Sequence, residues 1–311
     1  MKPTVVSVVG PTAVGKTKLG VEIAKRFNGE VISGDSMQIY RGMDIGTAKV
    51  SRKEANGIPH HMIDIKNPEE SFSVAEFQEK VTAAIEDILS RGKLPIIVGG
   101  TGLYIQSVLY NFNFSKQKRS IEITERLEAE LQEKGKNALH QRLAGIDPEQ
   151  AEKIHPNNER RLIRALEIYE STGMTMSQYQ KNQSKESPYQ PILIGLEMDR
   201  ERLYDRINRR VDTMMEEGLL EEVQSLYEAG LEEAQSMKAI GYKEFIPYLK
   251  GEYGLEQAVE LLKRNSRRYA KRQYTYFRNK MDIRWYTVSE EDYLEKFQII
   301  LGDLAGMIEQ T

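Results

Sequence analysis

Cysteine is absent from this chain of 311 residues. Without thiols there is no disulfide, no cysteine nucleophile and no cysteine-ligated zinc site, and the composition suits a reducing compartment. The four histidines give no metal centre either. His60 and His61 are adjacent, so their side chains diverge, while His140 and His155 stand alone. A histidine-based metal site is therefore not expected.

Long hydrophobic runs are missing as well. No stretch approaches the about 20 apolar residues of a membrane-spanning helix. The early run VVSVV leads directly into Gly10 and Pro11 with no small-residue cleavage site after it, unlike a signal peptide. We expect a soluble, cytoplasmic protein. The net charge of −3 gives no global sign of a nucleic-acid partner, although charge can still be segregated along the chain.

Short β-branched runs alternate with helical patterns in most of the chain. Runs at 4–9, 30–35, 94–100, 191–198 and 282–288 are typical of buried strands, and 17–27, 73–92 and 199–218 have helical periodicity. This alternation predicts an α/β fold with a parallel sheet flanked by helices.

Residues 115–190 interrupt that alternation. They contain no convincing strand, show helical periodicity at 123–135 and 157–173, and end in a polar run at 179–190. We predict a helical insertion domain at 115–190, ending in a mobile connector. The core would then consist of residues 1–114 and 191–311, with a basic helical region at its C-terminal end.

A glycine-rich loop follows the first predicted strand and precedes a helix. It matches the phosphate-loop pattern G-x-x-x-x-G-K-[ST] of P-loop NTPases, with Gly10, Pro11, Thr12, Ala13, Val14, Gly15, Lys16 and Thr17. Backbone N–H groups and the helix N-terminus would bind a diphosphate or nucleotide there. Lys16 would reach the terminal phosphates, and the Thr17 hydroxyl would bind Mg²⁺.

Two other loops follow predicted strands. Asp35 lies in the first, at the end of the second strand, and Thr101 lies in the Gly-rich second, after the run LPIIV. Carboxyl ends of parallel strands share one edge, so both residues should face the phosphate loop. Asp35 could serve as a base or bind a metal through water. On position alone, a helix-capping or turn role for Asp35 is equally compatible. The segment 40–49 that follows is typical of a binding loop.

Two clusters of basic residues complete the pattern. Arg206, Arg209 and Arg210 follow the strand at 191–198 on a predicted helix, where they could neutralise charge on phosphate oxygens. Residues 263–284 hold nine Lys or Arg and one acidic residue, interleaved with Tyr269, Tyr274, Tyr276 and Phe277. Such a segment suits contacts to an RNA backbone with stacking on unpaired bases. Tyr269 and Tyr276 share a helical side with Gln273, which also fits packing on a core.

These motifs together resemble the bacterial tRNA dimethylallyltransferases, also called tRNA isopentenyltransferases. The resemblance is carried, in the family's order, by GPTAVGKT, SGDSMQIYRGMDIGTAK, PHHMIDI, IVGGTGLY, HPNNERRLIRALEIY, AIGYKE and RRYAKRQYTYFR. It spans residues from 5 to about 280. Eukaryotic relatives add a C-terminal zinc finger, which a chain without cysteine does not contain, so the bacterial form is indicated.

The resemblance implies a reaction. The exocyclic amine of an adenosine 3′-adjacent to the anticodon attacks dimethylallyl diphosphate, and diphosphate leaves. Asp35 would be the base, with Thr101, Arg210 and Arg206 also catalytic and Mg²⁺ beside Thr17. ATP binding is a possible property of the loop that this chemistry does not require. We expect a monomer that binds the anticodon stem-loop of tRNA, with no membrane partner.

The resemblance also implies tRNA contacts. They comprise Asp35, Ser36, Met37, Gln38, Thr101, Arg160, Arg161, Arg164, Tyr242, Lys243, Arg268 and Arg272, with a looser match near Thr124 or Arg126. The basic segment and the insertion would clamp the tRNA.

Three alternative functions would also use the phosphate loop. A small-metabolite kinase leaves the basic segment and the insertion without a role. An enzyme that prenylates free adenine nucleotides needs no such clamp. A non-enzymatic RNA-binding protein needs no acid and hydroxyl at the phosphate site.

Overall fold

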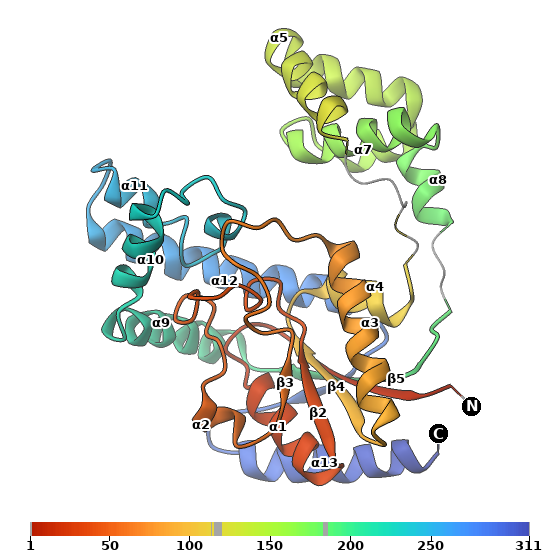
Figure 1. The fold of residues 1–311 in the computed structure, drawn as a ribbon, viewed down its shortest axis with the longest axis vertical. Helices are drawn as coiled ribbons and strands as arrows, with labels where there is room; N and C mark the ends of the chain where they lie inside the picture. Colours follow the sequence, from red (N-terminus) through yellow and green to blue (C-terminus); the bar gives the residue numbers. More distant parts are fainter. Residues whose placement is uncertain (1, 113, 115–119, 183–185, 311) are drawn as a thin grey trace. The chain divides into compact units, whose positions relative to one another are not determined.

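A computed structural model describes residues 2–112, 114, 120–182 and 186–310. Its centre is a six-stranded sheet in the order β3-β2-β4-β1-β5-β6, in which every pairing is parallel (Figure 1). The strands are β1 (Thr4–Val9), β2 (Gly29–Ser33), β3 (His60–His61), β4 (Leu94–Gly99), β5 (Gln190–Glu197) and β6 (Arg284–Thr287). The predicted α/β class with a parallel sheet is confirmed; the two-residue strand β3 was not anticipated.

Burial on both faces explains why the central strands are nearly continuous β-branched runs. Val6 in β1 lies opposite Ile96 of β4 and Ile192 of β5. Helices α3 (Val74–Ser90) and α4 (Gly102–Leu109) pack on one face through residues such as Phe77 and Ile105. Helices α1 (Lys16–Arg26) and α13 (Tyr293–Glu309) contribute to a second hydrophobic cluster with β1.

The sheet-containing unit has further helices. They are α2 (Arg52–Ala55), α9 (Arg200–Glu216), α10 (Leu219–Glu228), a 3₁₀ turn at Ser236–Lys238, α11 (Ile246–Leu249) and α12 (Leu255–Lys280). Helix α12 contains most of the basic segment, with the buried Ala270, Gln273 and Phe277 on its inner side. The packing interpretation of that segment is confirmed for this side, and the RNA-contact interpretation stays a prediction for the exposed basic residues of the same helix.

The chain divides into two compact units, residues Met1–Asn111 with Ser187–Thr311 and residues Phe112–Glu186. The second contains α5 (Ile121–Ile146), interrupted at Gly135, with α6 (Pro148–Lys153), α7 (Glu159–Thr172) and α8 (Met176–Lys181). It has a hydrophobic core of its own, which includes Leu127, Leu139 and Leu166. The first residues of the predicted connector, 179–181, belong to α8, whereas 183–185 lie outside the described residues.

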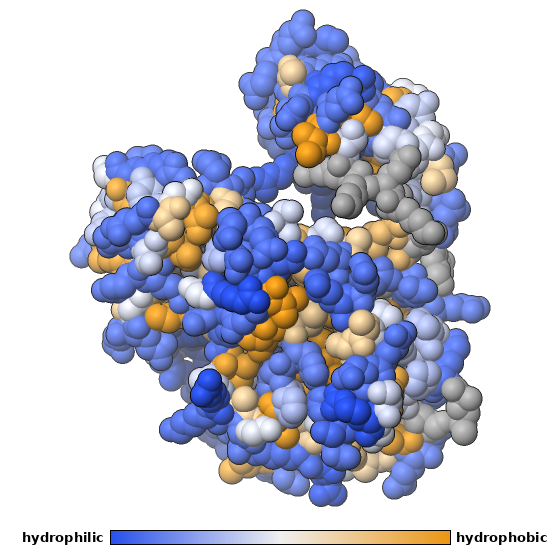
Figure 2. All heavy atoms as spheres, viewed as in Figure 1, coloured by the Kyte–Doolittle hydropathy of each residue, from blue (hydrophilic) through white to orange (hydrophobic). Residues whose placement is uncertain are grey.

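Within the described ranges, no helix combines the length and the apolar character needed to cross a membrane. The surface in Figure 2 is mostly hydrophilic, with hydrophobic side chains gathered toward the middle of the sheet-containing unit.

Candidate active site

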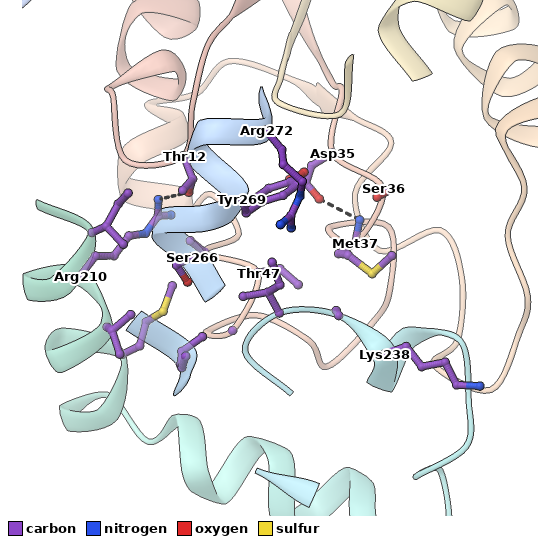
Figure 3. Close-up of a pocket in the computed structure, with 18 residues that line it drawn as sticks. Thr12, Asp35, Ser36, Met37, Thr47, Arg210, Lys238, Ser266, Tyr269 and Arg272 are labelled. Atoms are coloured by element: carbon purple, nitrogen blue, oxygen red, sulfur yellow. Dashed lines mark hydrogen bonds between the residues drawn. The ribbon is translucent and has the colours of Figure 1, made fainter. Parts of the chain in front are cut away.

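A cavity of about 280 Å³ lies in the sheet-containing unit beyond the carboxyl ends of β1 and β2. Polar and charged residues line part of it, including Thr12, Asp35 and Arg210 (Figure 3). The phosphate loop, the loop after β2 and helix α9 thus contribute to one cavity, as expected where parallel strands end.

The phosphate loop joins β1 to α1 through residues with positive φ. Gly10 has φ 144°, and a Cβ there would lie 2.5 Å from the carbonyl oxygen of Leu196, so only glycine fits. Lys16 opens α1, and its ammonium donates a hydrogen bond of 2.6 Å to the Pro11 carbonyl. Burial, and secondly the charge of Arg210, lower the pKa of Lys16 to about 7, while Asp35 opposes the shift.

The placement of Asp35 is compatible with both roles left open by its position. One carboxylate oxygen accepts the Met37 N–H at 2.8 Å, which closes a local turn, and the side chain also lines the cavity. Burial raises its pKa, while the Met37 N–H and the charges of Lys16 and Arg210 act in the opposite direction. Asp35 is therefore a carboxylate of raised proton affinity beside two cations, which suits a base at a phosphate site.

Thr101 is the residue before α4 and lies against the loop that holds Asp35. Its hydroxyl oxygen accepts the Ser36 N–H at 3.3 Å, and its own N–H donates to the Gly34 carbonyl at 3.3 Å. The predicted convergence of these two loops is thus visible in backbone contacts. Thr101 lies behind Ser36 and is not among the residues that line the cavity.

The three arginines of α9 differ in what they contact. Arg210 donates to the Thr12 hydroxyl at 3.3 Å and lines the cavity. Arg206 donates to the Ala13 carbonyl at 2.9 Å and pairs with Glu290, which Arg209 also contacts at 2.8 Å. Arg210 is therefore placed to contact a ligand in the cavity. Arg206 instead contacts the phosphate loop and Glu290, and Arg209 contacts Glu290.

Gln273 of α12 connects the two Gly-containing loops, and the sequence interpretation missed this role. Its side-chain oxygen accepts the Thr12 N–H at 2.9 Å, and its nitrogen donates to the Gly100 carbonyl at 3.1 Å. A Cβ at Gly100 would lie 2.0 Å from that nitrogen. One amide thus holds the phosphate loop and the Thr101 loop in register. The sequence signal that could have predicted this role is a glutamine among the aromatic and aliphatic residues of one helical side.

For Tyr269 the sequence suggested base stacking or core packing, and its place in the cavity was not anticipated. It lines the cavity one turn before Gln273, and the Arg272 guanidinium lies 5.6 Å from its ring centroid. Burial, and secondly the charge of Asp35, raise the pKa of Tyr269 to about 12. Its hydroxyl therefore remains protonated at neutral pH and can donate a hydrogen bond near Asp35.

The expected RNA-contacting residues of the sheet-containing unit fall into different environments. Ser36, Met37 and Arg272 line the cavity, while Arg268 and Lys243 are exposed.

The side chains of Gln38 and Tyr242 instead form hydrogen bonds within the protein. The Gln38 amide accepts from the Ser33 hydroxyl and donates to the Thr47 and Ala48 carbonyls. Tyr242 requires a correction. It is 0% exposed, and its hydroxyl donates to Glu222 at 2.6 Å, so it has no surface that could meet RNA.

The candidates in the helical unit lie on α5 and α7. Arg160, Arg161 and Arg164 are exposed on α7, and Arg164 forms an ion pair of 3.0 Å with Glu167. Thr124 is buried, which does not suit an RNA contact, and Arg126 pairs with Glu170. The exposed α7 arginines are thus the better placed of these residues for a polyanion.

A protein-family model described as IPP transferase matches residues 38–280 of the chain. The chain belongs to the IPP transferase family. Among curated members of this family, the tRNA dimethylallyltransferase of Oceanobacillus iheyensis is 61% identical over 310 residues, covering 100% of this chain and 99% of that protein. The protein of the same name from Bacillus anthracis is 57% identical over 302 residues, covering 97% and 95%.

Solved structures of IPP transferases have the same fold. The full-length tRNA isopentenylpyrophosphate transferase of Bacillus halodurans is 52% identical, with a TM-score of 0.77 and coverage of 100% of this chain and 98% of that one. A eukaryotic dimethylallyltransferase, described as acting on tRNA, is 35% identical, with a TM-score of 0.80 and coverage of 94% and 75%. The predicted family resemblance is confirmed.

Proposed function

We propose that this IPP transferase transfers a dimethylallyl group from dimethylallyl diphosphate to the exocyclic amine of the adenosine 3′-adjacent to the anticodon of a tRNA, with release of diphosphate. The observation that carries the proposal is that Asp35 and Arg210 line one cavity while the charge of Lys16 interacts with both, in a chain 61% identical to a tRNA dimethylallyltransferase. A base and two phosphate-binding cations at one point are what this substitution requires.

In the proposed reaction, the amine nitrogen forms a bond to the first carbon of the prenyl group as the bond to the diphosphate oxygen breaks. Asp35 accepts a proton from the amine as positive charge builds on the nitrogen. Lys16, Arg210 and the loop N–H groups stabilise the charge on the departing diphosphate. Arg206, which contacts the Ala13 carbonyl, supports the loop from outside.

The donor set fits a magnesium ion shared with the substrate. Among the described residues, no three His, Cys, Asp or Glu side chains come together as a metal site. Magnesium is commonly bound by one or two protein oxygens, substrate phosphates and water. The Thr17 hydroxyl, in the first turn of α1 after the loop, is the protein ligand we propose. The ion would supply neutralisation of the diphosphate charge.

The cavity also has an apolar side that suits the hydrocarbon part of the donor. Ile207, Val211 and Met214 of α9 and Leu262 of α12 line it. A diphosphate at the phosphate loop would leave its short branched chain next to these side chains, with burial favouring the chain by about 0.8 kcal/mol per CH₂.

For the tRNA, we propose that the anticodon loop contacts the exposed arginines and lysines of α12, and that the helical unit acts as a clamp through Arg160, Arg161 and Arg164. The target adenosine would leave the base stack to reach Asp35. The basic, tyrosine-bearing character of α12 supports this role.

The alternatives explain less of the molecule. A metabolite kinase or a nucleotide prenyltransferase would use the phosphate loop, but neither accounts for the basic side of α12 together with the helical unit.

The test of the proposed function is incubation of unmodified tRNA with dimethylallyl diphosphate and Mg²⁺, followed by mass analysis of the nucleosides. Prenylated adenosine in the tRNA is expected. Its absence, or phosphate transfer from ATP to a metabolite, would refute the proposal.

A further inference from the structure

Glu222 of α10 binds an unusual number of donors for a residue outside the reaction centre. Its carboxylate accepts the consecutive backbone N–H groups of Asp44, Ile45 and Gly46 at 2.8, 2.9 and 3.0 Å. It also accepts the Tyr242 hydroxyl at 2.6 Å. Successive N–H groups that converge in this way form an anion-binding nest, and here a side chain of the same molecule fills it.

The Tyr242 ring also packs closely against this loop. A Cβ at Gly46 would lie 2.6 Å from the Tyr242 ring, so only glycine allows the loop to approach so closely. Burial, and secondly Glu222, raise the pKa of Tyr242, so its hydroxyl stays protonated and donates. Gly241 (φ 103°) in turn lies against the Gly46 carbonyl oxygen. The loop is therefore held by charge-assisted hydrogen bonds and by shape.

The fixed loop forms a wall of the cavity. Gly46, Thr47 and Ala48 line it, and Gly46 is also the last of the three residues whose N–H groups Glu222 binds. Figure 3 shows Thr47 and Arg210 on different sides of this space. The backbone at 47–48 is also held by the Gln38 amide, so the wall is fixed at both ends.

We propose that Glu222 is a positioning residue that fixes the Gly46–Ala48 wall and thereby limits the size of the prenyl group that the cavity accepts. The inference rests on the proposed function, since it assumes a prenyl diphosphate as donor. The wall lines the same cavity as Val211, Met214 and Leu262, the residues proposed to contact the hydrocarbon chain, so it would restrict the room for a longer chain. Three N–H groups of this loop bind Glu222 and two of its carbonyls bind Gln38, so displacing the wall would break several hydrogen bonds.

The test compares kcat/KM for dimethylallyl diphosphate and the ten-carbon geranyl diphosphate, with tRNA as acceptor. Glu222→Gln keeps the shape, but it removes the negative charge and one acceptor, so N–H groups of the loop lose their partner. We expect the preference for dimethylallyl over geranyl diphosphate to fall by about fivefold or more, a change on the scale of small steric discriminations in apolar pockets.

Glu221→Gln is the matched control. Glu221 shares the first turn of α10 and the same interaction with the helix N-terminus, but it is exposed and does not contact the loop. Its donor preference should equal that of the wild type. Tyr242→Phe, which removes one of the four donors and keeps the ring, should shift the preference in the same direction by less. Tyr242→Phe also tests the proposal if the Glu222→Gln variant does not fold.

The outcomes separate the two proposals. If the wild type prenylates tRNA with neither donor, the proposed function fails. If the wild type is active and folded Glu222→Gln, or Tyr242→Phe in its place, lowers kcat/KM equally for both donors, the donor preference is unchanged and the role assigned to Glu222 is wrong.

Discussion

Asp35 and Arg210 line the cavity, and the charge of Lys16 interacts with both of them. Burial raises the pKa of Asp35 and lowers those of Lys16 and Arg210, whereas the attraction between Asp35 and the two cations works against these shifts. A site of this kind favours an incoming anion, because a diphosphate supplies the negative charge that the two cations lack.

Replacement of Asp35 by alanine should separate chemistry from binding. We expect kcat to fall by about a hundredfold or more, since positioned bases contribute on the order of 10²–10⁴-fold. The tRNA dissociation constant should change less than about threefold, because one carboxylate is a small part of an RNA interface. Single-turnover prenylation and filter binding measure the two. Comparable losses in both would make Asp35 a binding residue.

Diphosphate affinity should depend on pH through Lys16. The unfolded value of its pKa is 10.5 and the folded value is about 7, so the ammonium of the free enzyme loses its proton as pH rises through 7. A bound anion requires the ammonium, so the affinity for diphosphate should fall above pH 7, approaching tenfold per pH unit. Calorimetric titrations between pH 6.5 and 9 check this. The Lys16→Met variant should bind weakly and with a flatter profile.

The same shift predicts a trend in folding stability. Between pH 7 and 10.5 the unfolded chain binds more protons at Lys16 than the folded chain does. The free energy of unfolding contributed by Lys16 therefore rises with pH in this window. Denaturant titrations of the wild type and Lys16→Met should diverge in slope with pH there; parallel curves would argue against the lowered pKa.

At the scale of elements, α12 joins the RNA-facing and phosphate-facing parts of the proposed mechanism. Gln273 on its buried side holds the Thr12 N–H and the Gly100 carbonyl, whereas Arg264, Arg268 and Lys271 are exposed on other sides of the helix. A rigid helix with both sets of residues can place the phosphate loop and the acceptor RNA relative to each other.

Gln273→Glu should damage the site more than its small change in shape suggests. The Thr12 N–H keeps an acceptor, but a carboxylate oxygen would face the Gly100 carbonyl, two acceptors in contact without a proton. We expect kcat/KM to fall more than tenfold, with a lower Tm. Gln273→Met removes both hydrogen bonds without adding charge and separates the two effects. Normal activity in both variants would exclude the proposed bridging role.

The exposed basic side of α12 should control the salt dependence of tRNA binding. Neutral substitutions at Arg268 and Lys271 should each reduce the slope of log K against log salt by about one, if each contacts a phosphate. Lys25→Gln, on the exposed side of α1, is the control and should leave the slope unchanged. The slope is measured by binding titrations over a range of salt concentrations; a slope insensitive to α12 would place the RNA elsewhere.

At the scale of the whole molecule, two units with separate hydrophobic cores divide the chain. Replacement of residues 112–186 by a short Gly/Ser linker should leave the sheet-containing unit folded, because none of the described residues of that segment belongs to its hydrophobic clusters. We expect diphosphate binding to persist within about threefold and tRNA binding to weaken by tenfold or more. Circular dichroism and the two binding assays test this. Unchanged tRNA affinity would contradict the proposal that the helical unit clamps the tRNA.

The sequence by itself determined the sheet, the phosphate loop and the family. Those features depend on local pattern, namely β-branched runs, a glycine loop with a fixed spacing, and motifs in a fixed order. The tertiary structure decided which residues meet. Gln273 and Thr12 are 261 positions apart, and Glu222 and Gly46 are 176 apart, so no local pattern predicts either hydrogen bond. It also decided that Tyr242, in a motif associated with tRNA, is buried against Glu222. Whether a side chain faces solvent depends on packing between distant segments, which the local sequence does not specify.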